Sequence, residues 1–399
     1  MENIIVFLYI TATTIQLIYY LLIFSRLAFY NKKEEKKKVL ALPTPILTSS
    51  NEPLSKPTFQ DGIPVSVIIC AKNEAHNLQR FLPKILAQDY PVFEVLVVDD
   101  ASEDDTAMVL ANFQRENAHL QILTLRKGAK RDMSGKKFAL SKGIQNAKYE
   151  ALLLTDADCM PSSNAWIGRM VRHLGRKDIE IVLGYSPYET LEKWGLNAMI
   201  QYETLWTATQ YLSFALIKMP YMGVGRNMAY QKSVFDNNHG FVSHKNVQSG
   251  DDDLFINQVA NAQNTRIEIA SDAFCYSVPP ATWGAWYRQK HRHLSAGTHY
   301  QAKFKVLLGL IVASHFIFYS TLIATFFLEH CYITTITLFI VRLIVLVILF
   351  QKIIQKLNSP LTFWLIPLID FLYIFYYLIL FPTTLLNKHI QWKQTRPSI

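Results

Sequence analysis

Long apolar stretches lie at both ends of this chain and bracket a middle with the composition of a soluble protein. The first runs from about Ile4 to Leu27 and is followed by lysines at positions 32, 33, 36, 37 and 38. A bilayer core needs about 20 apolar residues in a helix, so this stretch is long enough to cross. A cleaved signal peptide is the alternative, but it would place basic residues first, and the chain starts Met1-Glu2-Asn3. We therefore expect an N-terminal membrane anchor.

The C-terminal third repeats the pattern in three stretches, Val306 to Leu328, Tyr332 to Phe350 and Leu361 to about Leu386. Because lysines follow the first stretch, the positive-inside rule places the N-terminus outside and the middle of the chain in the cytoplasm. Three further spans would then leave the basic tail outside, which the same rule disfavours. Two or three C-terminal spans therefore stay open, with one stretch re-entrant or interfacial as the alternative. Arg342 and Asp370 interrupt these stretches and are expected to face protein or water.

The net charge of +9 comes largely from lysines that flank the apolar stretches. This distribution indicates contact with a membrane surface and does not favour nucleic-acid binding. The four cysteines show no C-x-x-C spacing, so neither a zinc ribbon nor a disulfide framework is supported. These features predict an integral protein of the bacterial inner (cytoplasmic) membrane, with its central domain in the reducing cytoplasm.

The middle of the chain, after a linker at 31–63 that is lysine-rich and then rich in Pro, Ser and Thr, alternates strands with helices. Strands are expected at 65–70, 94–98, 121–125 and 151–154, and helices at 74–87, 106–117 and 137–146. Continuous apolar strands separated by helices predict an α/β domain with a mostly parallel sheet, covered on both faces.

Three of these strands end in polar, turn-forming groups: Lys72-Asn73-Glu74, Asp99-Asp100 and Asp156-Ala157-Asp158. In parallel α/β sheets ligands bind beyond the carboxyl ends of the strands, so we expect a site at this edge. The first strand is not followed by G-x-G-x-x-G, and Gly135-Lys136-Lys137 does not fit the P-loop spacing. A dinucleotide fold and an ATPase phosphate loop are therefore disfavoured.

The pair Asp156 and Asp158 offers hard oxygen ligands that suit Mg²⁺ or Mn²⁺. An Asp-rich turn that caps the next helix is the alternative. Similarly, Asp100 or Ser102 could cap a helix that begins near Asp105. The Ser134–Lys137 segment opens a helix where amide donors and a lysine could hold an anion, or it is simply a solvated basic helix start.

Taken together, these residues resemble the family-two glycosyltransferases of GT-A fold, in the cellulose, hyaluronan and ceramide-glucosyltransferase group. The motifs, in the order of that family, are Val67 to Glu74, Val97 to Ser102, Gly135 to Leu140, Thr155 to Asp158, Gly223 to Asn227, Gly250 to Leu254 and Arg288 to Arg292. The resemblance covers roughly residues 64–300.

The resemblance implies roles on the donor side of the site. Asp100, with Asn73, Glu74 and Asp99 nearby, would lie around the nucleobase and ribose, and Lys136 would approach the diphosphate. The remaining donor-side assignments are Asp156 and Asp158 for the nucleotide and its Mg or Mn ion, with Asp158 the direct ligand, and Gly225, Arg226 and Asn227 for substrate binding.

On the acceptor side the resemblance implies that Asp252, after Asp251, is the catalytic base. The alternative interpretation of the acidic run at 251–253 is that it only caps the N-terminus of a helix. Gln289, Arg292 and His293 match a Q-x-x-R-W motif that guards the acceptor end and the donor diphosphate, with histidine in place of its tryptophan. That departure puts long-chain polymer synthesis in doubt. His291 and His293 lie two residues apart, on different faces of a helix, and are not expected to share a metal.

Two further segments are expected at the membrane. Gln289 to Leu308 mixes cations with aromatic and apolar residues and could lie along the interface. The tail around Trp392 resembles a motif that folds back at the active-site mouth in membrane-bound members, with an interfacial tryptophan belt as the alternative.

The sequence thus predicts an inverting glycosyltransferase that moves a sugar from a nucleotide-diphosphate sugar, with UDP implied by the resemblance, to a lipid or growing glycan. A processive polysaccharide synthase, an inactive membrane scaffold and a basic module that binds anionic lipid are the alternatives. Nucleic acid is not an expected partner. The expected organisation is a membrane helix at 1–30, the linker at 31–63, a GT-A domain at 64–300, an interfacial segment with two or three membrane helices at 301–386, and a basic tail at 387–399.

Overall fold

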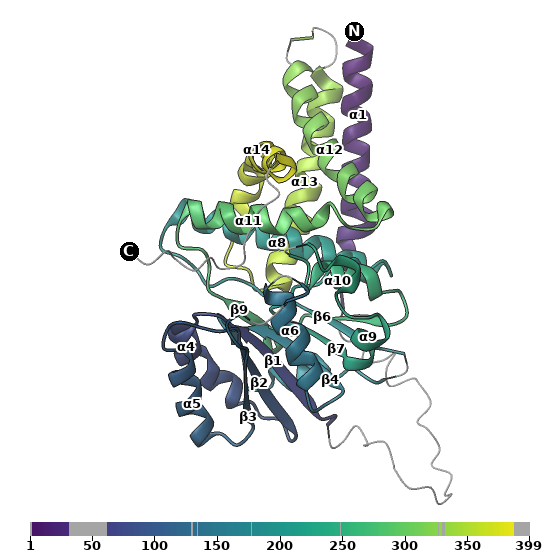
Figure 1. Cartoon of the computed structure of the whole chain (residues 1–399). Coiled ribbons are helices and arrows are strands. Elements are labelled where there is room, and N and C mark those ends of the chain that lie inside the picture. Colours follow the sequence, from purple (N-terminus) through teal and green to yellow (C-terminus); the bar gives the residue numbers. More distant parts are fainter. Residues whose placement is uncertain are drawn as a thin grey trace, which may run out of the picture.

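The structure, a computed structural model, describes residues 2–31, 62–128, 131–133, 135–176, 178–247, 249–325, 327–328 and 332–386. Figure 1 shows an α/β domain at one end of the molecule and a group of long apolar helices at the other. Helices α8 (Trp194–Leu216) and α11 (Trp283–Gly297) lie between the two parts. Most of linker 31–63 and Trp392 fall outside the described residues.

A seven-stranded mixed sheet forms the centre of the domain, in the order β3-β2-β1-β4-β7-β6-β8. Its strands are β1 (Val65–Ala71), β2 (Phe93–Asp99), β3 (Leu120–Thr124), β4 (Ala151–Asp156), β6 (Ile181–Gly184), β7 (Met228–Gln231) and β8 (Thr265–Glu268). β7 runs antiparallel to both β4 and β6, and the other pairs are parallel. The prediction of a mostly parallel sheet is confirmed, and the first four strands lie where the sequence placed them.

Two hydrophobic clusters cover the sheet, one on each face, which explains why its strands read as continuous apolar runs. In β1 the side chains of Val65, Val67 and Ile69 enter one cluster, and those of Ile68 and Cys70 enter the other. The domain helices are α4 (Ala75–Leu86), α5 (Thr106–Glu116), α6 (Gly135–Asn146), α7 (Trp166–Val171), α8, α9 (Lys232–Asn237), α10 (Asp253–Val259) and α11. A second, two-stranded sheet pairs β5 (Cys159–Pro161) with β9 (Cys275–Ser277).

Among the residues that the structure describes, four helical stretches are long and apolar enough to cross a membrane: Glu2–Ala28, Ala302–Thr325, Tyr332–Lys356 and Phe363–Leu380. The first combines α1 (Glu2–Ile18), a π-helical segment (Tyr19–Phe24) and α2 (Ser25–Ala28), and the others belong to α12, α13 and α14 (Ile366–Leu386). In Figure 1, α1, α12 and α13 stand side by side, whereas α14 is seen nearly end-on and so crosses them. The segment 289–308 is divided between two helices, because α11 ends at Gly297 and α12 begins at Ala302; its place along the membrane interface stays a prediction.

A buried ion pair joins these helices. Arg342 of α13 binds Asp370 of α14, and the two side chains are 1% and 0% exposed, so both face protein as expected. Arg342 Nε also donates to Gln16 Oε1 of α1 at 2.9 Å, and the Tyr319 hydroxyl of α12 donates to Asp370 at 2.6 Å. Each of the four helices therefore contributes a polar group to one buried cluster.

Candidate active site

Three strand ends meet at one edge of the sheet. In the parallel register Ala71 lies opposite Asp99, and Cys70 lies opposite Asp156. The residues that follow these strands are therefore neighbours in space, as the sequence predicted from their position.

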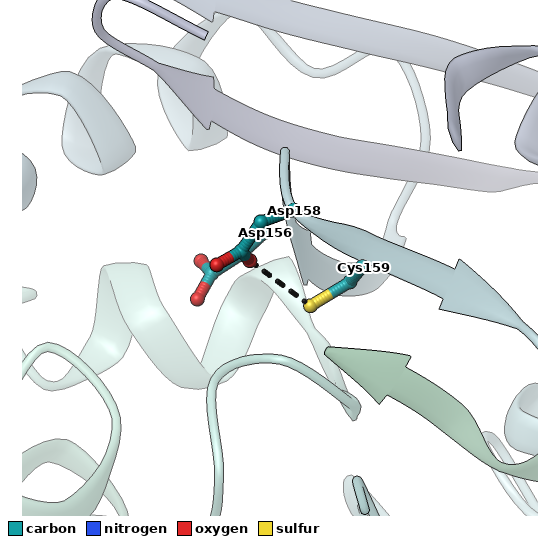
Figure 2. A group of neighbouring side chains, drawn as sticks. All are labelled: Asp156, Asp158 and Cys159. Carbon is teal, nitrogen blue, oxygen red and sulfur yellow. Dashed lines mark hydrogen bonds between the residues drawn. The ribbon is translucent and has the colours of Figure 1, made fainter. Parts of the chain in front are cut away.

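Asp156 and Asp158 form the acidic centre of this edge. With Cys159, they place one possible ligand atom each within 4.8 Å of one another. Figure 2 shows the two carboxylates side by side and pointing in the same direction, and the Cys159 thiol donates to Asp158 Oδ1 at 3.4 Å. Burial, followed by the charge of Asp156, raises the pKa of Asp158 to about 6.

The donor set fits a hard divalent cation better than a thiophilic one. Burial raises the pKa of the Cys159 thiol well above its ordinary value, and sulfur is a soft ligand that hard divalent cations do not favour. Two carboxylate oxygens remain, which are ligands that Mg²⁺ and Mn²⁺ accept. The residues present therefore fit the expected Mg or Mn ion.

Lys136, in the first turn of α6, connects the acidic centre to the next acidic run along the chain. Its ammonium lies 2.9 Å from Asp156 Oδ1 and 3.0 Å from Asp251 Oδ2. Burial lowers the pKa of Lys136, but these two carboxylates outweigh it and hold the pKa well above its usual value. A permanently charged ammonium therefore lies between the two acidic groups.

Lys137, the next residue, is a site residue that the sequence did not single out. It is fully buried, and its ammonium donates to the carbonyls of His244 and Val247, both at 2.8 Å. Those carbonyls belong to the loop just before the acidic run at 251–253. The first turn of α6 therefore holds both the acidic centre and this loop.

Asp252 is the N-cap of α10. Its Oδ1 accepts a hydrogen bond from the Asp253 amide and its Oδ2 accepts one from the Gly225 amide, both at 2.8 Å. A Cβ on Gly225 would lie 3.1 Å from the Asp252 Cβ, so the absence of a side chain permits this close approach. Asp252 therefore caps α10, as the alternative interpretation of the acidic run predicted. It is also the residue that the resemblance assigns as the base. Burial and Asp251 raise the pKa of Asp252.

Asp253 is hydrogen-bonded to the turn that leads into the apolar helix α12 (Ala302–Thr325). The Tyr300 hydroxyl donates to its Oδ2 at 2.8 Å, and Gln301 donates its backbone amide to Asn257 of α10 at 2.8 Å. Burial, followed by the charge of Asp252, raises the pKa of Asp253 to about 8. The turn that leads into α12 thus holds the helix that carries Asp252.

Asp100 is fully buried beneath the strand edge and pairs with Arg131, a partner that the sequence did not reveal. Arg131 donates two hydrogen bonds to it, at 3.0 and 2.5 Å, and the Lys72 ammonium lies 4.0 Å away. Asp99 accepts from the Ser102 amide. Neither Asp100 nor Ser102 caps α5, because Asp104 Oδ1 accepts from the Thr106 amide at 3.0 Å.

Asn73 and Glu74 follow β1 at the same edge. Asn73 has a positive φ of 54°, and its Oδ1 accepts from the Glu103 amide at 2.7 Å. This links the turn after β1 to the turn after β2. Glu74 accepts a hydrogen bond from Asn77.

The loop at 225–227 contributes side chains with different surroundings. Arg226 lies over the Tyr188 ring, 4.2 Å from its centroid. Asn227 is fully buried; its amide donates to the Tyr185 and Ala273 carbonyls, and its Oδ1 accepts from Trp166. The side chain of Asn227 thus holds the loop in place from the interior.

Helix α11 carries Gln289, Arg292 and His293. His293 is exposed, whereas His291 is buried and stacks on Tyr287. The two histidines therefore point different ways, as expected.

Comparison with known proteins decides the family. The family described as glycosyl transferase family group 2 matches residues 170–387, more than half of the chain, and glycosyl transferase family 2 matches residues 66–238. The chain belongs to glycosyltransferase family 2. It is therefore a transferase enzyme, and the resemblance found in its motifs is confirmed.

Relatives of this glycosyltransferase match it over part of their length. Glycosyltransferase AglE of Haloferax volcanii is 30% identical over 174 residues, 43% of this chain and 51% of that protein. The poly-β-1,6-N-acetyl-D-glucosamine synthase of Staphylococcus epidermidis is 30% identical over 112 residues, 28% of this chain and 26% of the synthase. This chain thus spans about half or less of the length of these two relatives.

A longer match is the probable glycosyltransferase YdaM of Bacillus subtilis, 25% identical over 294 residues that cover 68% of this chain and 67% of YdaM. Among solved structures, the mannosyltransferase PcManGT of Pyrobaculum calidifontis, in complex with GDP-Man and Mn²⁺, has a TM-score of 0.54 at 19% identity. That match covers 93% of this chain and 99% of PcManGT, and it supports the GT-A fold.

Proposed function

We propose that this glycosyltransferase moves a sugar from a UDP-sugar, with inversion at the anomeric carbon, to a lipid or growing glycan at the membrane. The observation that carries the proposal is the position of Lys136 between Asp156 and Asp251, next to Asp252. Groups that would bind the departing diphosphate and the group that would accept the acceptor proton are thereby adjacent.

Asp252 would act as the general base. As the acceptor oxygen bonds to the anomeric carbon, the bond from that carbon to the diphosphate oxygen breaks, and the acceptor proton passes to the Asp252 carboxylate. The Gly225 and Asp253 amides hold both carboxylate oxygens, which fixes the direction of the carboxylate. Asp251 would support Asp252 indirectly by holding Lys136.

The departing diphosphate gains negative charge, so it needs fixed cations around it. Lys136 and Arg292 would supply such charge, and Asp156 and Asp158 would hold a Mg or Mn ion. When bound, that ion neutralises charge on the diphosphate. The Mn²⁺ in the PcManGT complex supports this part of the proposal.

The nucleoside would lie over the ends of β1 and β2, near Asn73, Glu74, Asp99 and Asp100. Arg131 already holds both oxygens of Asp100, so we infer that Asp100 acts on the nucleotide at least partly through Arg131. UDP follows from the family resemblance. GDP is the competing nucleotide, because the PcManGT structure contains GDP-Man.

The acceptor would approach from α11, where Gln289, Arg292 and His293 lie close to the apolar helices. Histidine in place of the tryptophan of the Q-x-x-R-W motif removes a platform for stacking sugars, which favours a single transfer. The match to a poly-N-acetylglucosamine synthase supports a processive synthase as the second candidate. We place the catalytic domain in the cytoplasm, against the bacterial inner membrane.

Nucleotide release by the detergent-solubilised protein tests this proposal. We would supply UDP-, GDP- and TDP-sugars with Mn²⁺ or EDTA and a membrane lipid extract, and compare the wild type with Asp252→Asn. Metal-dependent release from one donor, lost in the variant, is the expected result, and product length separates single transfer from polymerisation. Release from GDP-sugars alone would overturn the UDP assignment, and no release from any donor would favour the inactive scaffold.

A further inference from the structure

A second buried ion pair lies outside the groups described so far, between α8 and α11. Lys290 Nζ lies 2.6 Å from Glu203 Oε2, and the two side chains are 4% and 8% exposed. Burying two charges is costly even when they pair, and the loss of one partner leaves the other charge uncompensated. The pair therefore strongly favours one position of α11 against α8.

The pair adjoins the active site through Tyr188. The Lys290 ammonium lies 5.7 Å from the centroid of the Tyr188 ring, and the Arg226 guanidinium lies 4.2 Å from the same centroid. Gln201 of α8 donates to the Tyr188 carbonyl at 3.3 Å. Glu203 thus pairs with a cation that shares the Tyr188 ring with Arg226, and α8 also binds the Tyr188 backbone.

The same turn of α8 contacts the apolar helices. Tyr202 donates to Asp370 Oδ1 at 3.5 Å, and its ring packs edge-on against Tyr373 of α14 at 5.2 Å. In α11, Trp286 lies one turn before Lys290 and packs against Tyr376 of α14 at 5.8 Å. Trp286 and Lys290 are four residues apart and lie on one face of α11. That face is therefore held by α14 at Trp286 and by α8 at Lys290, and the three helices are neighbours in Figure 1.

We propose that Glu203 is a positioning residue for transfer to the acceptor, because its ion pair with Lys290 fixes the rotation of α11 and so the placement of Gln289 and Arg292. Gln289 and Arg292 lie within the same turn as Lys290, and side chains in one turn of a helix move together when the helix rotates. A misplacement of about 1 Å can slow an enzyme by ~10²-fold. The proposal rests on the proposed function in assigning α11 to the acceptor.

The test compares Glu203→Gln, which keeps the shape and removes the charge, with the charge-swapped double variant Glu203→Lys with Lys290→Glu. The matched control is Glu189→Gln, because Glu189 pairs with Arg80 at 2.9 Å on a more exposed surface, with side chains 24% and 50% exposed. Each is assayed for nucleotide release from the preferred donor, without acceptor and with a membrane lipid extract.

We expect Glu203→Gln to lower acceptor-dependent release by about tenfold or more. Acceptor-free release should fall by a clearly smaller factor, because only Arg292, and not Gln289, is also assigned to the diphosphate. The charge swap should restore part of the loss, and Glu189→Gln should leave both rates unchanged. An unchanged acceptor-dependent rate in Glu203→Gln would overturn the proposal. So would an equal fall in both rates, since that indicates a general loss of structure.

Hydrogen–deuterium exchange gives a readout that needs no substrate. Glu203→Gln should speed exchange of the amides of α11, residues 283–297, while α4 and α5 exchange as in the wild type. Unchanged exchange in α11 would count against the positioning role even if no donor is turned over, so failure here is separable from failure of the proposed function.

Discussion

The Lys136 ammonium lies 3.0 Å from Asp251 Oδ2, and this contact joins the first turn of α6 to the acidic run that carries the proposed base. The same ammonium lies 2.9 Å from Asp156. One side chain therefore lies against both acidic groups of the site. Replacing it removes positive charge and leaves buried carboxylates to repel one another.

We expect Lys136→Met to lower kcat/KM by about 10²- to 10³-fold, the usual cost of losing one group that stabilises developing charge. The control is Lys142→Met, on the same helix, where the lysine contacts Gln145 and Phe138 instead of the acidic residues. Steady-state nucleotide release measures both. Equal activity of the two variants would argue against a role for Lys136 at the diphosphate.

Two neighbouring aspartates should respond differently to the same substitution. Asp252→Asn should abolish transfer, because an amide cannot accept the acceptor proton. Asp253 has its pKa raised to about 8 by burial and by Asp252, so it is largely protonated at pH 7 and an asparagine resembles it closely. We expect Asp253→Asn to keep activity within about threefold at pH 7. A comparable loss in both variants would show that Asp253 must be charged.

The stability of Asp253→Asn should depend on pH differently from that of the wild type. The folded-state pKa of Asp253, about 8, lies above its ordinary value of 3.8. Between these values the folded protein keeps a proton that the unfolded chain has lost, so this group destabilises the fold progressively as pH rises from about 4 to 8. Relative to the wild type, Asp253→Asn should gain about 1 kcal/mol or more between pH 5 and pH 8. Thermal unfolding in detergent at both pH values checks this, and parallel curves would contradict it.

Metal binding can be tested apart from catalysis. Mn²⁺ at about 100 times its Kd should stabilise the folded protein by about 2.7 kcal/mol, seen as a higher Tm that EDTA reverses. Asp158→Asn should lose this shift. Cys159→Ser is the matched variant, because sulfur is a soft ligand and the Cys159 thiol is not expected to bind a hard cation. A Tm shift that depends on Cys159 and survives loss of Asp158 would place the ion elsewhere.

The pair of Arg342 and Asp370, between the long apolar helices, should behave as a buried ion pair. Arg342→Leu leaves Asp370 buried without its cation and should destabilise the protein by about 3–5 kcal/mol. The double variant Arg342→Leu with Asp370→Leu should recover much of that loss, because no unpaired charge remains. Unfolding midpoints of the detergent-solubilised variants measure the coupling, and additive losses would indicate that the pair contributes little.

The sequence determined the features that depend on local pattern. Continuous apolar runs predicted the strands β1 to β4, because a sheet covered on both faces needs no polar alternation. The position of Asp99, Asp156 and Asp158 directly after strands predicted their meeting, because parallel strands end at a common edge. Family membership followed from motifs that keep their order along the chain.

Only the tertiary structure decided which groups pair across long separations. Lys136 with Asp251, Lys290 with Glu203 and Arg342 with Asp370 are each separated by 28 to 115 residues. No local sequence pattern specifies such partners. The residues around a charged side chain in the sequence do not show whether solvent or another helix or strand surrounds it in the fold. Burial makes these pairs specific, since an unpaired charge is tolerated in water and is costly inside the fold.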